Sequence, residues 1–143
     1  MRLRVMGERY YFDTSIWLDF FEDRDEPNFP KGKWAQEIVE RIIETNGKIV
    51  YSDLVLVELQ VGGYSSFEVE ILFKKLKSVL VFIESTERLQ GKAKDLAVKR
   101  NVPKGDALHA LLAREAKATL ISFDGHFKEL QDIVKTKKPQ EKI

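Results

Sequence analysis

The sequence contains no cysteine, which excludes disulfide bonds, catalytic thiolates and thiolate-bound zinc. It has only two histidines, His109 and His126, and two are few for a catalytic zinc centre. The metal ligands that remain are mainly carboxylate oxygens, which suit hard cations such as Mg²⁺, Mn²⁺ and Ca²⁺. Any metal site in this protein is therefore expected to be built from aspartate and glutamate.

Long hydrophobic runs are also absent, since no apolar stretch approaches the ~20 residues that span a bilayer. The opening segment, residues 1–7, is too short and too weakly apolar for a signal peptide. We therefore expect a cytoplasmic protein with no membrane partner. The formal net charge is only +1, so total charge says little about nucleic-acid binding.

Length and composition favour one compact domain. The chain has 143 residues, of which 43% are hydrophobic, and this content is sufficient for a core. We find no internal repeat and no linker that would divide it. Residues 1–143 are expected to form a single domain, in which a polar tail from about 135 to 143 frays.

Short apolar segments alternate with amphipathic ones along the chain. Strands are predicted at 10–12, 48–51, 79–83 and 119–123, with an edge strand at 133–134. Helices are predicted at 16–21, 34–46, 54–61, 67–77, 87–99, 106–117 and 127–130. This alternation predicts an α/β fold of three layers, α/β/α, around a mostly parallel twisted sheet of four or five strands.

Two aspartates directly follow predicted strands. Asp13 comes after the first strand, and Asp124 comes after the strand that ends at Phe123. The carboxyl ends of strands in open α/β sheets form the crevice where ligands bind, so neighbouring strands would bring these side chains together. The alternative is that each aspartate only caps the helix that follows it.

Two further carboxylates lie in apolar helices. Glu58 occupies Leu54–Leu59, where burial of a charge without a partner would be costly; alternatively it reaches water or a lysine at the helix edge. Asp106 opens the helix after Pro103-Lys104-Gly105, and capping there is compatible with a functional role. Carboxylates that cluster repel by about 4 kcal/mol per pair at 4 Å, and a divalent cation relieves this repulsion.

Four segments together resemble the motifs of the PIN domain family (named for the PilT N-terminus), and the likeness covers nearly the whole chain. They are Tyr11–Trp17, Ser52–Leu59, Gly105–Ala110 and Leu120–Asp124. The resemblance implies that Asp13, Glu58, Asp106 and Asp124 bind Mg²⁺ or Mn²⁺. It also assigns Ser122 to the catalytic site and gives Thr14 or Ser15 an assisting role.

Three other residues lie close to these motifs. Where family members often have a further acidic residue, Gly125-His126-Phe127 stands here, so a fifth acidic ligand is not expected. We interpret His126 as a surface residue at a helix start, with a water or phosphate contact as the alternative. His109 is interpreted as a packed, hydrogen-bonded histidine rather than a metal ligand. Lys104 is a candidate phosphate contact because it lies two residues from Asp106.

The family resemblance implies a metal-dependent endoribonuclease that leaves 5′-phosphate and 3′-hydroxyl ends on its RNA substrate. Short single-domain members resemble VapC-type toxins, so we expect a small antitoxin as partner and a homodimer. The alternatives are a housekeeping RNA-processing nuclease and a PIN domain that binds RNA or protein without cutting. A haloacid-dehalogenase-type phosphatase fits less well, because Ser15 stands where that class has a second aspartate.

Overall fold

The computed structural model describes residues 7–143; residues 1–6, part of the segment judged too short for a signal peptide, lie outside that range. One parallel sheet has the strand order β3-β2-β1-β4-β5. The strands are β1 Arg9–Phe12, β2 Lys48–Ser52, β3 Leu80–Ile83, β4 Thr119–Ile121 and β5 Thr136–Lys137. This confirms the predicted α/β class, and the sheet is parallel throughout.

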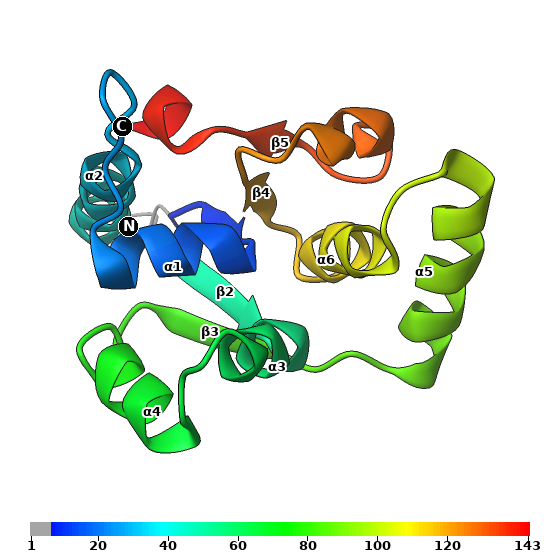
Figure 1. The fold of residues 1–143 in the computed structure, drawn as a ribbon, viewed down its shortest axis with the longest axis horizontal. Helices are drawn as coiled ribbons and strands as arrows, with labels where there is room; N and C mark the ends of the chain where they lie inside the picture. The colour runs from blue at the N-terminus through cyan, green and yellow to red at the C-terminus, as the bar shows by residue number, and fades with distance from the viewer. Residues whose placement is uncertain (1–6) are drawn as a thin grey trace, which may run out of the picture.

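Helices cover the sheet (Figure 1). They are α1 Thr14–Glu22, α2 Lys31–Glu44, α3 Asp53–Val61, α4 Ser66–Lys74, α5 Glu87–Arg100 and α6 Lys104–Glu115, with short 3-10 helices η1 Gly125–Leu130 and η2 Pro139–Lys142. α1 packs against α2 and α3, whereas α6 packs against α5 and η1. No helix in the described part of the chain is long and apolar enough to cross a membrane.

The order in which strands are added to the sheet reverses at β1, although all strands stay parallel. The chain runs outward from β1 through β2 to β3, and then returns to form β4 on the other side of β1. Phe12 and Ile121 are register partners at the ends of β1 and β4. The residues that follow these two strands therefore leave the sheet side by side, at the kind of reversal where open α/β sheets bind ligands.

The core lies on both faces of the central strands. Three successive residues of β1, Tyr10–Phe12, are buried, which explains why this strand is continuously apolar rather than alternating. Trp17 of α1 packs its ring against Phe12 on one side and Phe73 of α4 on the other. These contacts fix α1, which begins directly after Asp13, against the sheet.

The edge strand differs from the prediction. The apolar pair Ile133 and Val134 closes a turn by donating to the carbonyl of Leu130, and β5 follows at Thr136–Lys137. Ser122 N–H donates to the carbonyl of Lys137 at 3.0 Å, which holds this segment against the end of β4. Part of the tail from about 135 to 143 that was expected to fray is thus paired with β4. Backbone hydrogen bonds, and not apolar side chains, hold this strand in the sheet.

Leu120, completely buried in β4, tests the contribution of this core. Leu120→Ala is expected to lower the free energy of unfolding by about 2–5 kcal/mol, because it leaves a cavity in the centre of the sheet. Val98→Ala on the exposed face of α5 is the control and should change it by less than about 0.5 kcal/mol. Urea denaturation followed by circular dichroism measures both, and equal effects would contradict the burial of β4.

Candidate metal centre

Asp13 lies where β1 ends, and it is buried. Its Oδ1 accepts hydrogen bonds from Ile16 N–H at 3.1 Å and from Ser15 Oγ at 2.8 Å. The hydrogen bond from Ile16 makes Asp13 the N-cap of α1, so the predicted capping role of this aspartate is confirmed. Burial raises the pKa of Asp13, and the hydrogen bonds from Ser122 and Ser15 oppose that increase.

Ser122 joins the ends of β1 and β4. Its Oγ donates to Oδ2 of Asp13 and accepts from the backbone N–H of Asp124 at 2.9 Å. The serine therefore holds the Asp13 carboxylate and, at the same time, the loop that carries Asp124. Both oxygens of Asp13 have hydrogen-bond donors, which offsets much of the cost of burying this carboxylate.

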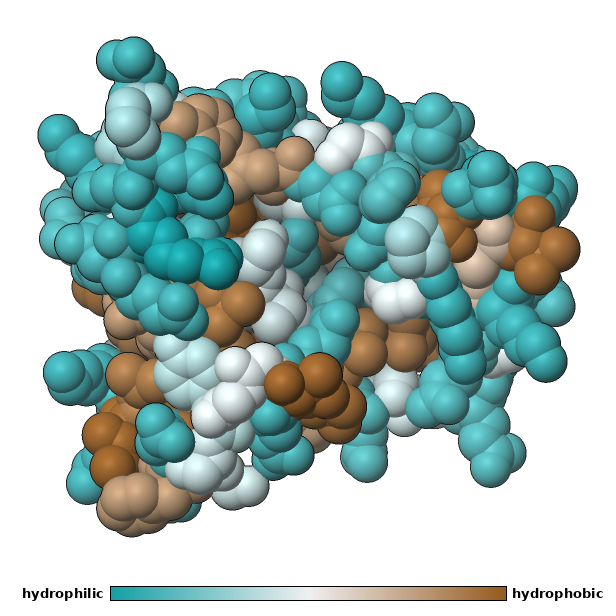
Figure 2. All heavy atoms as spheres, in the orientation of Figure 1, coloured by the Kyte–Doolittle hydropathy of each residue, from teal (hydrophilic) through white to brown (hydrophobic). Residues whose placement is uncertain are grey.

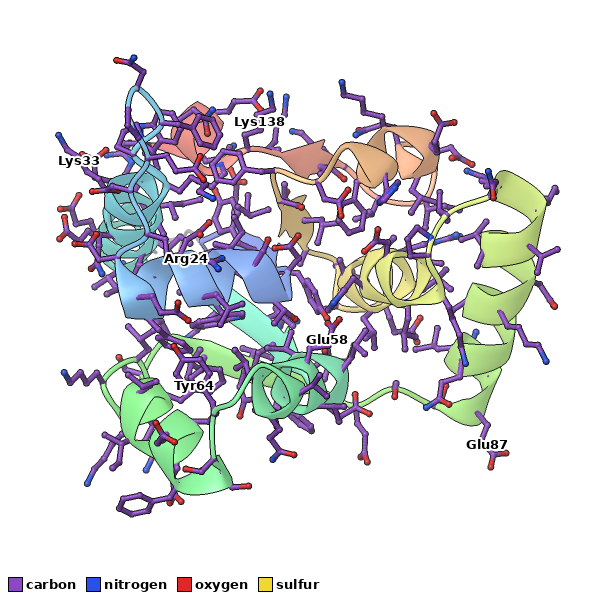
Figure 3. All side chains as sticks on the ribbon, in the orientation of Figure 1. Arg24, Lys33, Glu58, Tyr64, Glu87 and Lys138 are labelled. Carbon is purple, nitrogen blue, oxygen red and sulfur yellow. The ribbon has the colours of Figure 1, made fainter. Side chains whose placement is uncertain are left out.

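Glu58 projects from the side of α3 that faces α1 and α6 (Figure 3). Its Oε1 accepts a hydrogen bond from Thr14 Oγ1 at 2.8 Å and lies 2.5 Å from His109 Nε2. Burial by itself would raise the pKa of Glu58, but the hydrogen bond and the electrostatic attraction of His109, together with the hydrogen bond from Thr14, outweigh it and lower the pKa. Glu58 is thus held as a carboxylate, and it has the partners that its apolar helix requires.

His109 is buried in α6, and both of its ring nitrogens have partners. Nδ1 lies 2.7 Å from the hydroxyl of Tyr11, while Nε2 is the nitrogen that contacts Glu58. The interpretation of a packed, hydrogen-bonded histidine is confirmed by these contacts. No ring nitrogen of His109 is left to serve as a metal ligand.

Asp106, Asp124 and His126 form one compact group, in which one ligand atom of each residue lies within 4.8 Å of the others. His126 Nδ1 lies 3.0 Å from an oxygen of each aspartate. Asp124 also accepts from His126 N–H at 2.9 Å and so caps η1. Burial raises the pKa of Asp106, and the negative charge of Asp124 raises it further.

In the described structure the four predicted carboxylates belong to three hydrogen-bonded groups along one edge of the sheet. One is around Asp13, one is around Glu58, and one contains both Asp106 and Asp124. Ser122 connects Asp13 to the loop of Asp124. α6 connects Glu58 to Asp106, because this helix carries both Asp106 and His109, and Nε2 of His109 contacts Glu58. Asp13 and Glu58 are not part of the compact group of Asp106, Asp124 and His126. Shared coordination of one ion by all four carboxylates stays a prediction.

The compact group fits a divalent cation in size and charge. Octahedral Mg²⁺ binds oxygens at 2.0–2.1 Å, so its opposite ligands are about 4 Å apart, and the ligand atoms of this group all lie within 4.8 Å of one another. Asp106 and Asp124 repel each other, and a cation between them would remove that repulsion. The two carboxylates suit Mg²⁺ and Mn²⁺, whereas the imidazole is a ligand more typical of other transition metals.

The predicted substrate residues take different positions. Thr14 and Ser15 begin α1, where their hydroxyls donate to Glu58 and Asp13 respectively and so orient these carboxylates. Lys104 begins α6 and lines a small cavity of about 310 Å³ together with Gly105 and Leu108. The assignment of these three residues to substrate binding stays a prediction.

Sequence reasoning missed the place of His126 between two carboxylates, although it identified a surface residue at a helix start. It also missed the contact of Tyr11 with His109, because Tyr11 appeared only as an apolar residue of a strand. One signal was available for His126. In the sequence Asp124-Gly125-His126, which follows a strand, the backbone N–H and the ring of the histidine are within reach of the aspartate that caps the turn. No local signal connects Tyr11 with His109, which are 98 residues apart.

A family model described as PIN domain matches residues 10–133, which include every residue of the candidate metal centre. No curated protein is significantly similar to the chain.

Several solved structures share the fold over nearly the whole chain. The first is from VapBC2 of Rickettsia felis bound to a promoter DNA fragment, with 20% identity and a TM-score of 0.64, covering 91% of this chain and 98% of that one. A toxin–antitoxin complex from Klebsiella pneumoniae follows with 18% identity and a TM-score of 0.64, covering 91% and 97%. VapBC-1 from nontypeable Haemophilus influenzae has 21% identity and a TM-score of 0.63, covering 92% and 98%. Likeness at these identities shows a common fold.

The repulsion at Asp106 predicts a gain in stability when its charge is removed. Asp106→Asn keeps an oxygen that can accept from His126, and it should raise Tm by about 2–4 °C near pH 7. Because the pKa of Asp106 is raised in the folded protein, its charge destabilises the fold above the carboxyl's usual pKa; the gain should therefore vanish below about pH 4. Differential scanning fluorimetry across this pH range measures both effects. A lower Tm for Asp106→Asn than for the wild type at pH 7 would refute the repulsion between Asp106 and Asp124.

Proposed function

Because the chain belongs to the PIN domain family, we propose that it is a ribonuclease that hydrolyses RNA phosphodiester bonds with the help of Mg²⁺ or Mn²⁺. The observation that carries this proposal is the compact group of Asp106, Asp124 and His126 at the carboxyl edge of the sheet. Asp13 and Glu58 are two further carboxylates, held in place by hydrogen bonds from Ser122 and Thr14. Carboxylates of this kind are typical of sites for divalent cations and phosphate chemistry.

In this scheme Asp13, Glu58, Asp106 and Asp124 hold the ion. When bound, a divalent cation polarises the phosphoryl oxygens and lowers the pKa of a water that attacks phosphorus in line. The bond from phosphorus to the 3′ oxygen breaks, that oxygen takes a proton, and the products carry a 5′-phosphate and a 3′-hydroxyl. Thr14, Ser15 and Ser122 orient the carboxylates, and Lys104 is assigned to a substrate phosphate.

We assign the role of toxin in a toxin–antitoxin pair, with the domain of residues 1–143 acting in the cytoplasm as a homodimer. Support comes from the shared fold with chains of toxin–antitoxin complexes. Exposed apolar side chains on α3, α4 and β3 also suit a protein partner. They are Val57, Val61, Phe67, Ile71 and Phe82. Figure 2 shows hydrophobic residues gathered over α4.

RNA cleavage is the direct test of the proposed chemistry. With a mixed RNA pool and Mg²⁺ or Mn²⁺, we expect the wild type to cut and Asp106→Asn to lose at least ~100-fold in rate, because the variant lacks a charged ligand. Asp95→Asn on the exposed face of α5 is the matched control and should cut normally. Cleavage that survives Asp106→Asn would contradict the assigned site, and binding of RNA without any cleavage would support a non-catalytic domain.

The toxin role has its own test in living cells. Induced expression in a bacterial host should stop growth, and Asp106→Asn expressed to the same level should not, because growth arrest depends on RNA cleavage. Growth curves with an immunoblot for equal expression measure this. Normal growth with a wild-type protein that is active in vitro would argue for a housekeeping nuclease instead.

A further inference from the structure

A buried row of hydrogen bonds leads from the start of α3 to the carboxylate of Glu58. Ser52 Oγ lies 2.7 Å from the hydroxyl of Tyr11, and that hydroxyl lies 2.7 Å from Nδ1 of His109. Nε2 of His109 contacts Oε1 of Glu58 at 2.5 Å. Ser52 and Tyr11 are completely buried and His109 is nearly so. The row joins residues of four elements, β2, β1, α6 and α3.

The proton positions along this row follow from its two ends. At one end, Ser52 Oγ accepts from Val55 N–H at 3.2 Å, so its own proton is free to be donated to Tyr11. At the other end, an ionised carboxylate can only accept, so Nε2 of His109 carries a proton. With a proton on Nε2 alone, Nδ1 accepts from Tyr11, and each proton in the row then has one acceptor.

The hydroxyl of Tyr11 is suited to this role. Burial raises the pKa of Tyr11, so its hydroxyl keeps the proton that it donates to Nδ1. Nε2 of His109 therefore keeps its proton for Oε1 of Glu58, while the hydroxyl of Tyr11 holds the ring at Nδ1.

The consequence at Glu58 is a difference between its two oxygens. Oε1 receives both hydrogen bonds, from His109 and from Thr14. Oε2 is the oxygen near Gly105, at the start of the helix that carries Asp106. A Cβ at residue 105 would lie 3.8 Å from Oε2, at ordinary van der Waals distance. One oxygen is thus saturated while the other stays available.

We propose that Tyr11 and His109 are positioning residues that fix the orientation of Glu58, so that only Oε2 is available to bind a cation. This inference rests on the proposed function and extends it to two residues outside the acidic group. Hydrogen-bond partners behind a metal ligand commonly change metal affinity by 10–100-fold. Neither residue touches the substrate or the ion in this proposal.

The tautomer is measured first, in the wild type without metal and without RNA. ¹⁵N-edited NMR of the histidine rings should show a proton on Nε2 of His109, and His109→Gln identifies its signals. A ring whose only proton is on Nδ1 would overturn the proposal. This measurement does not depend on whether the protein cuts RNA.

Mn²⁺ affinity, followed by the electron paramagnetic resonance signal of the free ion, is the second measurement. Tyr11→Phe should weaken binding by about tenfold, because Nδ1 loses its donor and His109 is no longer held. Tyr10→Phe is the matched control on the same strand; it removes only a hydrogen bond to Glu8, and it should bind Mn²⁺ within about twofold of the wild type. A lower Tm for Tyr11→Phe with unchanged Mn²⁺ affinity would show a merely structural role and refute the proposal.

A pair of substitutions at His109 covers the case in which Tyr11→Phe does not fold. His109→Gln keeps an N–H that can donate to Oε1 and should bind Mn²⁺ more tightly than His109→Leu, by about fivefold or more. Equal affinities would overturn the proposal. Mn²⁺ binding without RNA cleavage would refute the nuclease and leave the positioning role intact, whereas no Mn²⁺ binding by the wild type would refute both.

Discussion

The hydrogen bond from Ser122 to Asp13 joins the ends of the two strands on which the site depends. β1 and β4 are neighbours, and their last residues, Phe12 and Ile121, are register partners. Asp13 is buried there and still needs donors for both of its oxygens, so the chain that leaves β4 must supply one. Ser122 meets this need and also holds the N–H of Asp124. The loop that carries the second aspartate is thereby fixed beside the first.

The stability of this edge is a balance between repulsion and hydrogen bonding. The negative charge of Asp124 disfavours that of Asp106, and His126 is the one side chain of their compact group that can offset this repulsion. Asp13 and Glu58 are instead surrounded by donors. The two kinds of carboxylate suit different tasks. A repelling pair gains most from a cation, whereas a carboxylate with many donors keeps its orientation whether or not an ion is present.

Much of the fold was predictable because its signals are local. The order of strands and helices follows from apolar segments, caps and turns, and the predicted strands before β5 are all found. The edge strand was misplaced because β5 is defined by its pairing with β4, and Thr136–Lys137 has no apolar pattern. The contact between Tyr11 and His109 could not be predicted for the same reason, since it joins residues of different elements.

The sequence by itself determined the chemical character of this protein: an α/β chain without cysteine, with carboxylates after two strands and in two apolar helices. These features depend on residue type and local spacing, which a sequence shows directly. Only the tertiary structure decided how the carboxylates are grouped, that His126 lies between Asp106 and Asp124, and that one oxygen of Glu58 is saturated. Those features depend on distances of a few ångströms between separate elements, which are set by the packing of the helices on the sheet.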